Sequence, residues 1–254
     1  YDKAARLIRE MGCYTVSWTT ILRMDVDIER YRHDDASRFA TVDESGKPVV
    51  LFADGCMKAL MCPATEYWQN CITDTTERLL KSNLSGVYYD EICSTGVQMC
   101  LSKEHGHTIG GGNYGLNGYR KIMETMHDRF RKEFPEYYSL GEQNGEYLIG
   151  VHDLNYMFLL FHADHVPAFQ AVYHDYSLCN SRLSGKFQDF CEEYAYADPG
   201  GKTNLEELAV LGFRNFSYGI HPGVVRLDLP EYSPEGAAIA RDLGRMWLDN
   251  QKYV

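Results

Sequence analysis

The chain has 254 residues, 44% of them hydrophobic and 24% charged, a composition typical of a globular domain. Its 25 Lys and Arg against 36 Asp and Glu give a formal net charge of −11, which disfavours nucleic acid or an anionic membrane surface as a partner, because Lys and Arg contacts to phosphate supply most of that affinity. No apolar run reaches the ~18–20 residues needed to cross a bilayer, so we expect neither kind of partner.

Helical and strand patterns alternate along the chain from its first residues. Helices are predicted at 1–11 and 63–82, from Leu116 to Phe130, and beginning at Thr203 and at Ser233. Short β-rich runs predict strands at 13–18, 86–90, 137–142, 155–160, 168–173 and 215–218. Two further β-rich runs flank the polar turn 43–47 and predict a β-hairpin inserted near 38–54.

The alternation predicts an α/β fold with a parallel sheet, because helices between buried strands imply crossover connections. Such a sheet can close into a (β/α)8 TIM barrel or stay open and doubly wound. No Gly-x-Gly-x-x-Gly follows a first strand and no P-loop is present, so the open nucleotide-binding forms lack their usual motif. Since there is no internal repeat or low-complexity segment, one domain over residues 1–254 is the simplest interpretation.

Two predicted strands end in a carboxylate, Asp90 and Glu142, and catalytic residues of α/β barrels gather at the carboxyl ends of the strands. A pair of carboxyl groups lets one act as nucleophile or base while the other donates a proton to a leaving oxygen. The alternative is that these acids are solvated or cap the following helices. The absence of Gly-x-Ser-x-Gly disfavours acyl transfer through a serine.

The loop after Asp90 contains Glu104, His105 and His107, followed by three consecutive glycines. Imidazole and carboxylate groups are good metal ligands, so a metal-dependent hydrolase using the two histidines is one hypothesis. The other is a glycine-rich loop folded over a pocket. We expect no metal and no cofactor. The 19 tyrosines, many of them at predicted strand ends, suit sugar rings as well as a wet core boundary.

Eight cysteines are scattered through the chain, with no Cys-x-x-Cys pair and no Cys/His array at zinc-finger spacing. We interpret them as reduced structural thiols, which favours a reducing, cytoplasmic compartment over a disulfide scaffold. Residue 1 is Tyr rather than Met, so the absence of a signal peptide carries no weight.

Several segments together resemble an uncharacterised family of glycosidase-like barrels, distantly similar to endo-α-N-acetylgalactosaminidases. The resemblance extends over about residues 50 to 250. It rests on Met61-Cys62-Pro63-Ala64-Thr65-Glu66-Tyr67-Trp68-Gln69, Gly86-Val87-Tyr88-Tyr89-Asp90-Glu91-Ile92, His105-Gly106-His107 with Gly110-Gly111-Gly112, Gly141-Glu142-Gln143-Asn144-Gly145-Glu146-Tyr147, the run 166–173, and Phe216-Ser217-Tyr218-Gly219-Ile220-His221-Pro222-Gly223.

The resemblance implies a (β/α)8 glycoside hydrolase barrel in which Asp90, ending strand four, is the nucleophile and Glu142, ending strand five, is the proton donor. Glu91 stands where the family usually has Gln. Glu146, His107 and Tyr173 match positions expected to line the sugar pocket. The full set of expected substrate-binding residues is Tyr88, Glu91, His105, His107, Tyr114, Glu146, Tyr173 and His221.

Six strands are predicted where a complete barrel has eight. If 13–18 is strand three, the first two strands precede Tyr1, and the chain is a barrel truncated at its N-terminus, a partial catalytic domain with exposed sheet edges.

The sequence thus predicts a retaining glycoside hydrolase acting on an oligosaccharide or other glycoside, with a non-catalytic carbohydrate-binding barrel and a metal-dependent hydrolase as alternatives.

Overall fold

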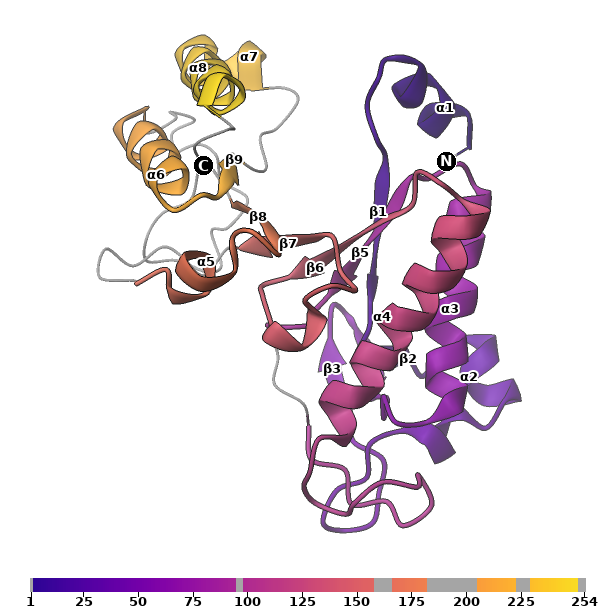
Figure 1. Cartoon of the computed structure of the whole chain (residues 1–254). Helices are drawn as coiled ribbons and strands as arrows, with labels where there is room; N and C mark the ends of the chain where they lie inside the picture. The colour runs from indigo at the N-terminus through magenta and orange to yellow at the C-terminus, as the bar shows by residue number, and fades with distance from the viewer. Residues whose placement is uncertain (1, 95–97, 158–165, 182–204, 223–228, 251–254) are drawn as a thin grey trace. The chain divides into compact units, whose positions relative to one another are not determined.

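The computed structural model describes residues 2–94, 98–157, 166–181, 205–222 and 229–250 (Figure 1). The chain divides into two compact units, residues 1–153 and 154–254, which are described separately. Each unit contains parallel strands and helices, so the predicted α/β class with a parallel sheet is confirmed.

None of the helices in these residue ranges has the length and apolar character that a membrane span requires.

The first unit contains a parallel sheet, a small antiparallel sheet and covering helices. The parallel strands are β1 (Val16–Thr20), β5 (Gly86–Asp90) and β6 (Tyr138–Glu142). The antiparallel strands, in the order β2-β4-β3, are β2 (Arg23–Asp25), β4 (Cys56–Leu60) and β3 (Val50–Ala53). The helices are α1 (Asp2–Glu10), α2 (Glu29–His33), α3 (Glu66–Lys81) and α4 (Tyr114–Glu133), with the 3-10 turns η1 (Ala36–Phe39) and η2 (Glu146–Leu148).

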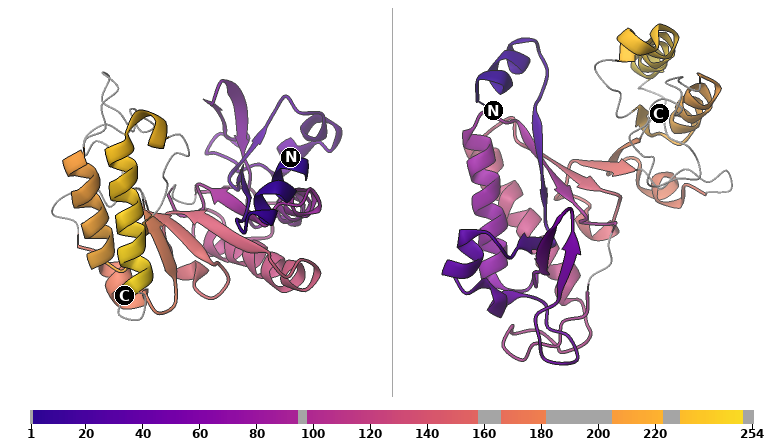
Figure 2. Two further views of the ribbon diagram at one scale, coloured as in Figure 1. Left: turned by 90° about the horizontal axis from the view of Figure 1, so that it is seen from above. Right: turned by 180° about the vertical axis from the view of Figure 1, so that it is seen from behind.

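Strand β5 separates the helical face of the sheet from the face that carries Asp90. Its side chains alternate: Val87 and Tyr89 are fully buried, whereas Tyr88 and Asp90 are half-buried on the other side. The Tyr89 hydroxyl lies 2.9 Å from Thr76 Oγ1 of α3 and donates to the Met126 sulfur of α4. Figure 2 shows α3 and α4 side by side along the sheet. The core therefore lies between the strands and the helices, and the opposite face of β5, which carries Asp90, is only half-buried.

The predicted helices of this unit are confirmed, with small shifts at their ends. α1 ends as expected before Gly12, whose φ of 79° is left-handed. α3 begins at Glu66, after Pro63, because the Thr65 hydroxyl accepts the Trp68 amide at 3.4 Å and caps the helix. α4 buries Tyr119, Met123, Met126 and Phe130 at steps of three and four residues, whereas Leu116 is exposed.

The inserted hairpin is larger than the predicted 38–54. The polar turn exists, with an isolated bridge between Val42 and Pro48, but the main ladder pairs β3 with β4 around Asp54 and Gly55. Both turn residues have positive φ, 51° and 79°, a conformation that favours a tight turn. β2 then adds a third strand to this sheet.

The second unit pairs short parallel strands and adds helices. Its elements are β7 (Leu154–Met157), α5 (Ala168–Tyr173), β8 (Leu178–Ser181), α6 (Leu205–Ser217), β9 (His221–Pro222), α7 (Leu229–Tyr232) and α8 (Pro234–Asn250). β8 pairs with both β7 and β9 in parallel. Ser233 Oγ accepts the Gly236 amide at 3.2 Å, so α8 begins where the Ser-Pro pattern predicts.

Two predicted strands of this unit are wrong. Residues 168–173 form helix α5, in which Phe169 and Tyr173, four residues apart, place their ring centroids 5.0 Å from each other. Residues 215–218 lie at the end of α6, and the strand comes later, at β9. Elsewhere, the predicted strand 13–18 begins later, at Val16. Residues 158–160 and the expected helix start at Thr203 lie outside the described residues.

Candidate active site

The two predicted catalytic acids lie at the same edge of the parallel sheet. β5 and β6 pair in parallel from Gly86 with Tyr138 to Tyr89 with Gly141, so both strands end side by side. The carboxyl groups of Asp90 and Glu142 are close enough for the charge of Glu142 to raise the pKa of Asp90. Both acids therefore end neighbouring strands of one parallel sheet, and their catalytic roles stay a prediction.

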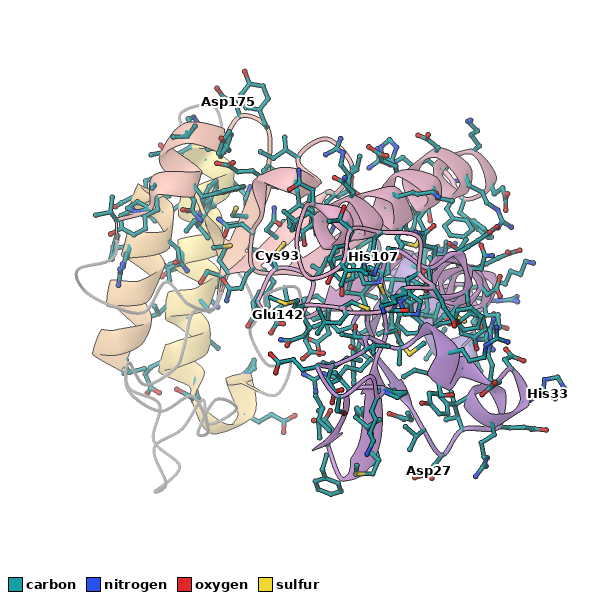
Figure 3. All side chains as sticks on the ribbon, turned by 90° about the horizontal axis from the view of Figure 1, so that it is seen from below. Asp27, His33, Cys93, His107, Glu142 and Asp175 are labelled. Carbon is teal, nitrogen blue, oxygen red and sulfur yellow. The ribbon has the colours of Figure 1, made fainter. Side chains whose placement is uncertain are left out.

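Glu142 accepts hydrogen bonds from the residues that follow β5. Its Oε2 accepts the Glu91 amide at 2.8 Å and also the Ser94 hydroxyl. Its backbone carbonyl accepts the Cys93 amide at 3.2 Å, and Figure 3 labels Cys93 next to Glu142 in this region. These bonds fix the direction of the Glu142 carboxyl group relative to Asp90, because a side chain held at its tip loses its rotamer freedom.

The residue after each acid has a left-handed backbone: φ is 68° at Glu91 and 60° at Gln143. Non-glycine residues in this region are uncommon and each costs on the order of 1 kcal/mol or more. The strain turns the chain sharply at both strand ends and leaves Asp90 and Glu142 as the last residues of their strands. Such outliers cluster at functional sites, and here they mark both acids.

Charges around Asp90 act in opposite directions. Burial and the neighbouring Glu142 carboxylate raise the pKa of Asp90 to about 6, while Arg23 opposes the rise. Arg23 forms an ion pair with Glu91, whose Oε2 also accepts the Thr20 hydroxyl at 3.0 Å. Glu91 is only 9% exposed and is tied into this pair. It therefore positions Arg23 beside Asp90.

Lys58 and Asp54 extend this network onto the antiparallel sheet. Lys58 is 7% exposed, and its Nζ lies 2.8 Å from Asp54 and 3.7 Å from Asp25. Hydrogen bonding to Lys58 lowers the pKa of Asp54, whose carboxylate in turn raises that of Asp90. The sequence did not single out Arg23, Asp54 or Lys58. The only available sequence signal was Asp54-Gly55, a pair typical of a hairpin turn, at the end of the predicted hairpin. The observed turn lies at this pair and brings the Asp54 carboxylate close enough to affect Asp90.

Two expected sugar-binding residues belong to elements beside the acids. Tyr88 shares the half-buried face of β5 with Asp90. Glu146 begins η2 and is exposed. The next residue, Tyr147, donates its hydroxyl to the Ile92 carbonyl and accepts from Cys93 Sγ at 3.6 Å, so η2 is anchored on the loop after β5.

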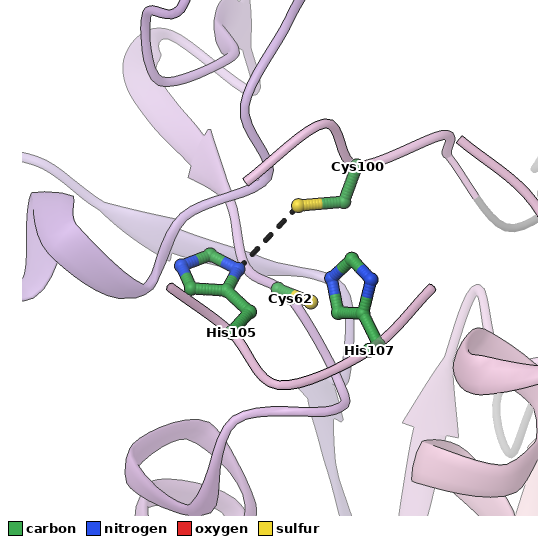
Figure 4. Close-up of side chains that lie close together, drawn as sticks. All are labelled: Cys62, Cys100, His105 and His107. Atoms are coloured by element: carbon green, nitrogen blue, oxygen red, sulfur yellow. Dashed lines mark hydrogen bonds between the residues drawn. The ribbon is translucent and has the colours of Figure 1, made fainter. Parts of the chain in front are cut away.

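Three other expected sugar-binding residues form a separate cluster. His105, His107 and Tyr114 lie with Cys62 and Cys100, and the ring of His107 stacks on Tyr114 with centroids 3.9 Å apart. Figure 4 shows the cysteines and histidines converging. The interaction between the two thiols lowers the pKa of Cys100 and raises the pKa of Cys62.

Tyr173 and His221 belong to the second unit. Tyr173 is the last residue of helix α5 rather than a strand end as predicted. His221 stacks on Trp247 with centroids 4.3 Å apart, and burial lowers its pKa.

The fold of the chain matches solved glycosidase structures. An α-galactosidase from Thermus thermophilus covers 95% of this chain, and the chain covers 49% of it, with a TM-score of 0.64 at 15% identity. For an α-N-acetylgalactosaminidase from Bifidobacterium bifidum the figures are 96% and 37%, with a TM-score of 0.65 at 12% identity. A GH31 sulfoquinovosidase from E. rectale gives 99% and 38%, with a TM-score of 0.67 at 10% identity. The chain thus has the α/β fold of TIM-barrel glycosidase domains.

The chain belongs to the family described as a domain of unknown function, DUF6259, whose profile matches residues 1–182. This confirms the predicted resemblance to an uncharacterised glycosidase-like family. A Bacteroides thetaiotaomicron protein described as a candidate glycoside hydrolase is 26% identical over 132 residues, which are 49% of this chain and 19% of that protein. The chain therefore spans about a fifth of that relative and half or less of the solved structures above.

Proposed function

We propose that this chain carries the catalytic pair of a glycoside hydrolase that cleaves an O-glycosidic bond, with Asp90 as nucleophile and Glu142 as general acid and base. The observation that carries the proposal is the electrostatic coupling of these two carboxyl groups at the ends of neighbouring parallel strands. Paired carboxyl groups are the working parts of most glycoside hydrolases. The glycosidase fold and the relationship to a candidate glycoside hydrolase support it.

The proposed reaction retains the configuration of the sugar. Retaining enzymes hold their carboxyl groups about 5–5.5 Å apart, whereas inverting enzymes need roughly 6.5–9.5 Å to admit a water molecule. Two carboxyl groups that end adjacent parallel strands and interact electrostatically suit the shorter separation. In the first step Asp90 Oδ attacks the anomeric carbon while Glu142 gives its proton to the leaving oxygen. In the second, Glu142 takes a proton from water, which attacks the same carbon and releases Asp90.

The charges around Asp90 act on its proposed role in two directions. Burial and the Glu142 carboxylate raise the pKa of Asp90 to about 6, so Asp90 is ionised, as a nucleophile must be, above about pH 6. The Arg23 guanidinium opposes this rise and so favours the ionised form. The proposed mechanism requires Glu142 to bring the proton that the leaving group receives.

The substrate class we propose is an α-galactoside or an α-N-acetylgalactosaminide. Solved structures with the same fold include an α-galactosidase in complex with p-nitrophenyl α-D-galactopyranoside and an α-N-acetylgalactosaminidase in complex with GalNAc. The first substrates to test are therefore the p-nitrophenyl α-glycosides of galactose and N-acetylgalactosamine, with the matching β-glycosides for comparison.

The proposal is tested by turnover of the full-length protein that contains this chain, with Asp90→Asn and Glu142→Gln. We expect each variant to lose at least about 10²–10⁴-fold in kcat/KM, the usual contribution of such groups. Asp74→Asn is the matched control, since Asp74 is an exposed acid on α3 paired with Arg30. Undiminished turnover in both site variants would overturn the assignment.

A second measurement separates the roles. Azide should restore turnover to Glu142→Ala with an activated leaving group and yield a glycosyl azide of retained configuration, because the covalent step no longer needs the proton donor. An azide product of inverted configuration from Asp90→Ala would be the usual sign that Asp90 is the nucleophile. Sugar binding by calorimetry without product release would instead favour the non-catalytic carbohydrate-binding barrel.

A further inference from the structure

Four side chains of the first unit converge on one small volume apart from the acid pair. Cys62 follows β4, and Cys100, His105 and His107 lie in the long loop between β5 and α4 (Figure 4). One ligand atom from each lies within 4.8 Å of all the others. Both cysteines are 0% exposed. Two thiols and two imidazoles at this separation are a donor set suited to zinc.

Each histidine turns one nitrogen towards the cluster and uses the other on the backbone. His105 Nε2 donates to the Arg38 carbonyl at 2.8 Å, and its Nδ1 lies 3.4 Å from Cys100 Sγ. His107 Nδ1 donates to the Thr108 carbonyl at 2.9 Å. Because a carbonyl only accepts, these bonds fix the tautomers and leave a bare lone pair on His105 Nδ1 and on His107 Nε2. Metal-bound histidines have this outer bonding pattern.

His107 Nε2 is buried and has no hydrogen-bond partner. An unsatisfied buried nitrogen is costly, and native structures usually provide a partner or hold an ion at such a position. Here the missing partner would stand within reach of both cysteines and His105. A cluster held only by thiol hydrogen bonds leaves this lone pair unexplained.

One of the two sulfur atoms also accepts a backbone amide, because the Val42 amide donates to Cys100 Sγ at 3.5 Å. Amide donors stabilise thiolates, the form in which cysteine binds metal. The Thr65 amide donates to the Cys62 carbonyl at 3.1 Å, so a turn directly after Cys62 fixes the backbone of this cysteine.

We propose that Cys62, Cys100, His105 and His107 bind one zinc ion in a closed, tetrahedral site. Bonds of about 2.3 Å to sulfur and 2.0–2.1 Å to nitrogen would place the ligand atoms roughly 3.3–3.8 Å apart. The observed limit of 4.8 Å therefore requires shifts of no more than about 1 Å. Two thiolates balance the charge of the ion, which suits a buried position.

The site is structural rather than catalytic, since four protein ligands leave no position for a water or substrate. It therefore differs from the metal-dependent hydrolase considered from the sequence and from the expectation of no metal. Its effect is to fasten the loop after β5 to the segment between β4 and α3. The same loop is tied to the inserted hairpin, where the Leu101 amide donates to the Val42 carbonyl at 2.8 Å.

The first test is metal content. The full-length protein is purified under reducing conditions without a polyhistidine tag, and zinc is counted by mass spectrometry of the digested protein. We expect about one zinc per chain in the wild type, falling to under about a tenth in Cys100→Ser and His107→Ala. Cys13→Ser and His33→Ala, at exposed positions outside the cluster, are the matched controls and should keep the metal.

The second test works on the wild type alone, so it does not depend on variants that fold. Cobalt loaded in place of zinc should give the strong visible absorption of a tetrahedral site and sulfur-to-cobalt charge transfer in the near ultraviolet. No stoichiometric zinc after growth in zinc-supplemented medium, octahedral cobalt spectra, or a Cys62–Cys100 disulfide found by mass mapping would each overturn the proposal. None of these outcomes bears on the acid pair, whose test is turnover.

Discussion

The acid pair and the Cys/His cluster both bring side chains together at a cost in stability. The two carboxylates repel each other, and the cluster contains a buried nitrogen without a hydrogen-bond partner. Asp90 and Glu142 bring two carboxyl groups together at strand ends. Cys62, Cys100, His105 and His107 bring sulfurs and a bare nitrogen together in loops. Packing alone favours neither arrangement. We propose that a proton and a sugar substrate stabilise the acid pair and that a zinc ion stabilises the cluster.

The difference lies in what holds each group. The acids end two strands whose other faces pack on α3 and α4, so a rigid scaffold forces them together. Three of the four members of the cluster lie in the loop that joins β5 to α4, so the ligands and their ion would have to hold this loop to Cys62. Removing a member of the acid pair should then affect chemistry, and removing a member of the cluster should affect stability.

The largest expected effect separates the two regions directly. Asp90→Asn should lower kcat/KM by about 10²–10⁴-fold while zinc content stays the same, because the variant removes the attacking oxygen and touches no ligand of the cluster. Cys100→Ser should empty the zinc site and lower turnover much less, mainly through a mobile loop. Parallel zinc and turnover measurements on both variants check this. Loss of zinc in Asp90→Asn would show that the regions are not separate.

A glycine next to Cys62 offers the next effect. A Cβ on Gly118 of α4 would lie 2.5 Å from the Pro63 carbonyl oxygen, and backbone on both sides leaves little room to adjust. Gly118→Ala should therefore destabilise the fold by about 1–3 kcal/mol, the usual cost of overpacking, and weaken zinc retention. The measurement is urea unfolding with and without chelator.

The control for this variant is Gly244→Ala in α8, where an added Cβ meets nothing within 4 Å. It should stabilise the protein by up to about 1 kcal/mol, the difference in helix propensity. Equal destabilisation by both variants would mean that the close approach of α4 to Pro63 is not what matters.

The acid pair should weaken the fold at the pH where it is ionised. The pKa of Asp90 is raised from 3.8 to about 6, so the folded state binds the proton more tightly than the unfolded state does. The contribution of Asp90 to the free energy of unfolding must then fall as pH rises between these two values. Asp90→Asn should be more stable than wild type by about 1–2 kcal/mol above pH ~6, after allowing for solvent screening, and no more stable below pH ~4.

Thermal melts across this pH range on the two proteins measure that difference. Asp74→Asn on α3 should show no such pH-dependent gain. A difference in stability between Asp90→Asn and wild type that does not change from pH ~4 to ~7 would contradict the raised pKa. The gain at neutral pH together with the loss of turnover would be the mark of a catalytic pair kept at the expense of stability.

The sequence predicted one of these regions and not the other, for a physical reason. A strand such as Gly86–Asp90 carries its own period, and an acid at its end can be placed from local pattern alone. The cluster draws Cys62 from a segment distant in sequence, and its burial follows from folding of the hairpin. The local spacing of Cys100, His105 and His107 matches no common zinc motif, and the family resemblance assigns His105 and His107 to the sugar pocket.

The misplaced strands follow the same division. A short apolar run such as 168–173 suits a strand or a helix equally, and the preceding Pro167 at the helix N-cap went unused as a signal. β8 reads Leu-Cys-Asn-Ser and β9 has only two residues, so neither shows an apolar period. Arg23 and Lys58 lie on short strands whose burial depends on tertiary pairing, which no local pattern reveals.

The smallest expected effect concerns the cap of α3, beside Cys62. Thr65 Oγ1 accepts the Trp68 amide at 3.4 Å and donates to the Cys62 carbonyl at 2.8 Å, so one hydroxyl both starts the helix and orients the cysteine. Thr65→Ala should cost about 1 kcal/mol, the usual value of an N-cap, and Thr65→Ser should recover most of it.

Chelator titrations of the two variants extend the comparison to the metal. If the hydroxyl matters only to the helix, both variants will release zinc like wild type. If it also fixes the Cys62 turn, Thr65→Ala alone will release zinc at lower chelator concentration, which would join helix start and metal site in one local structure.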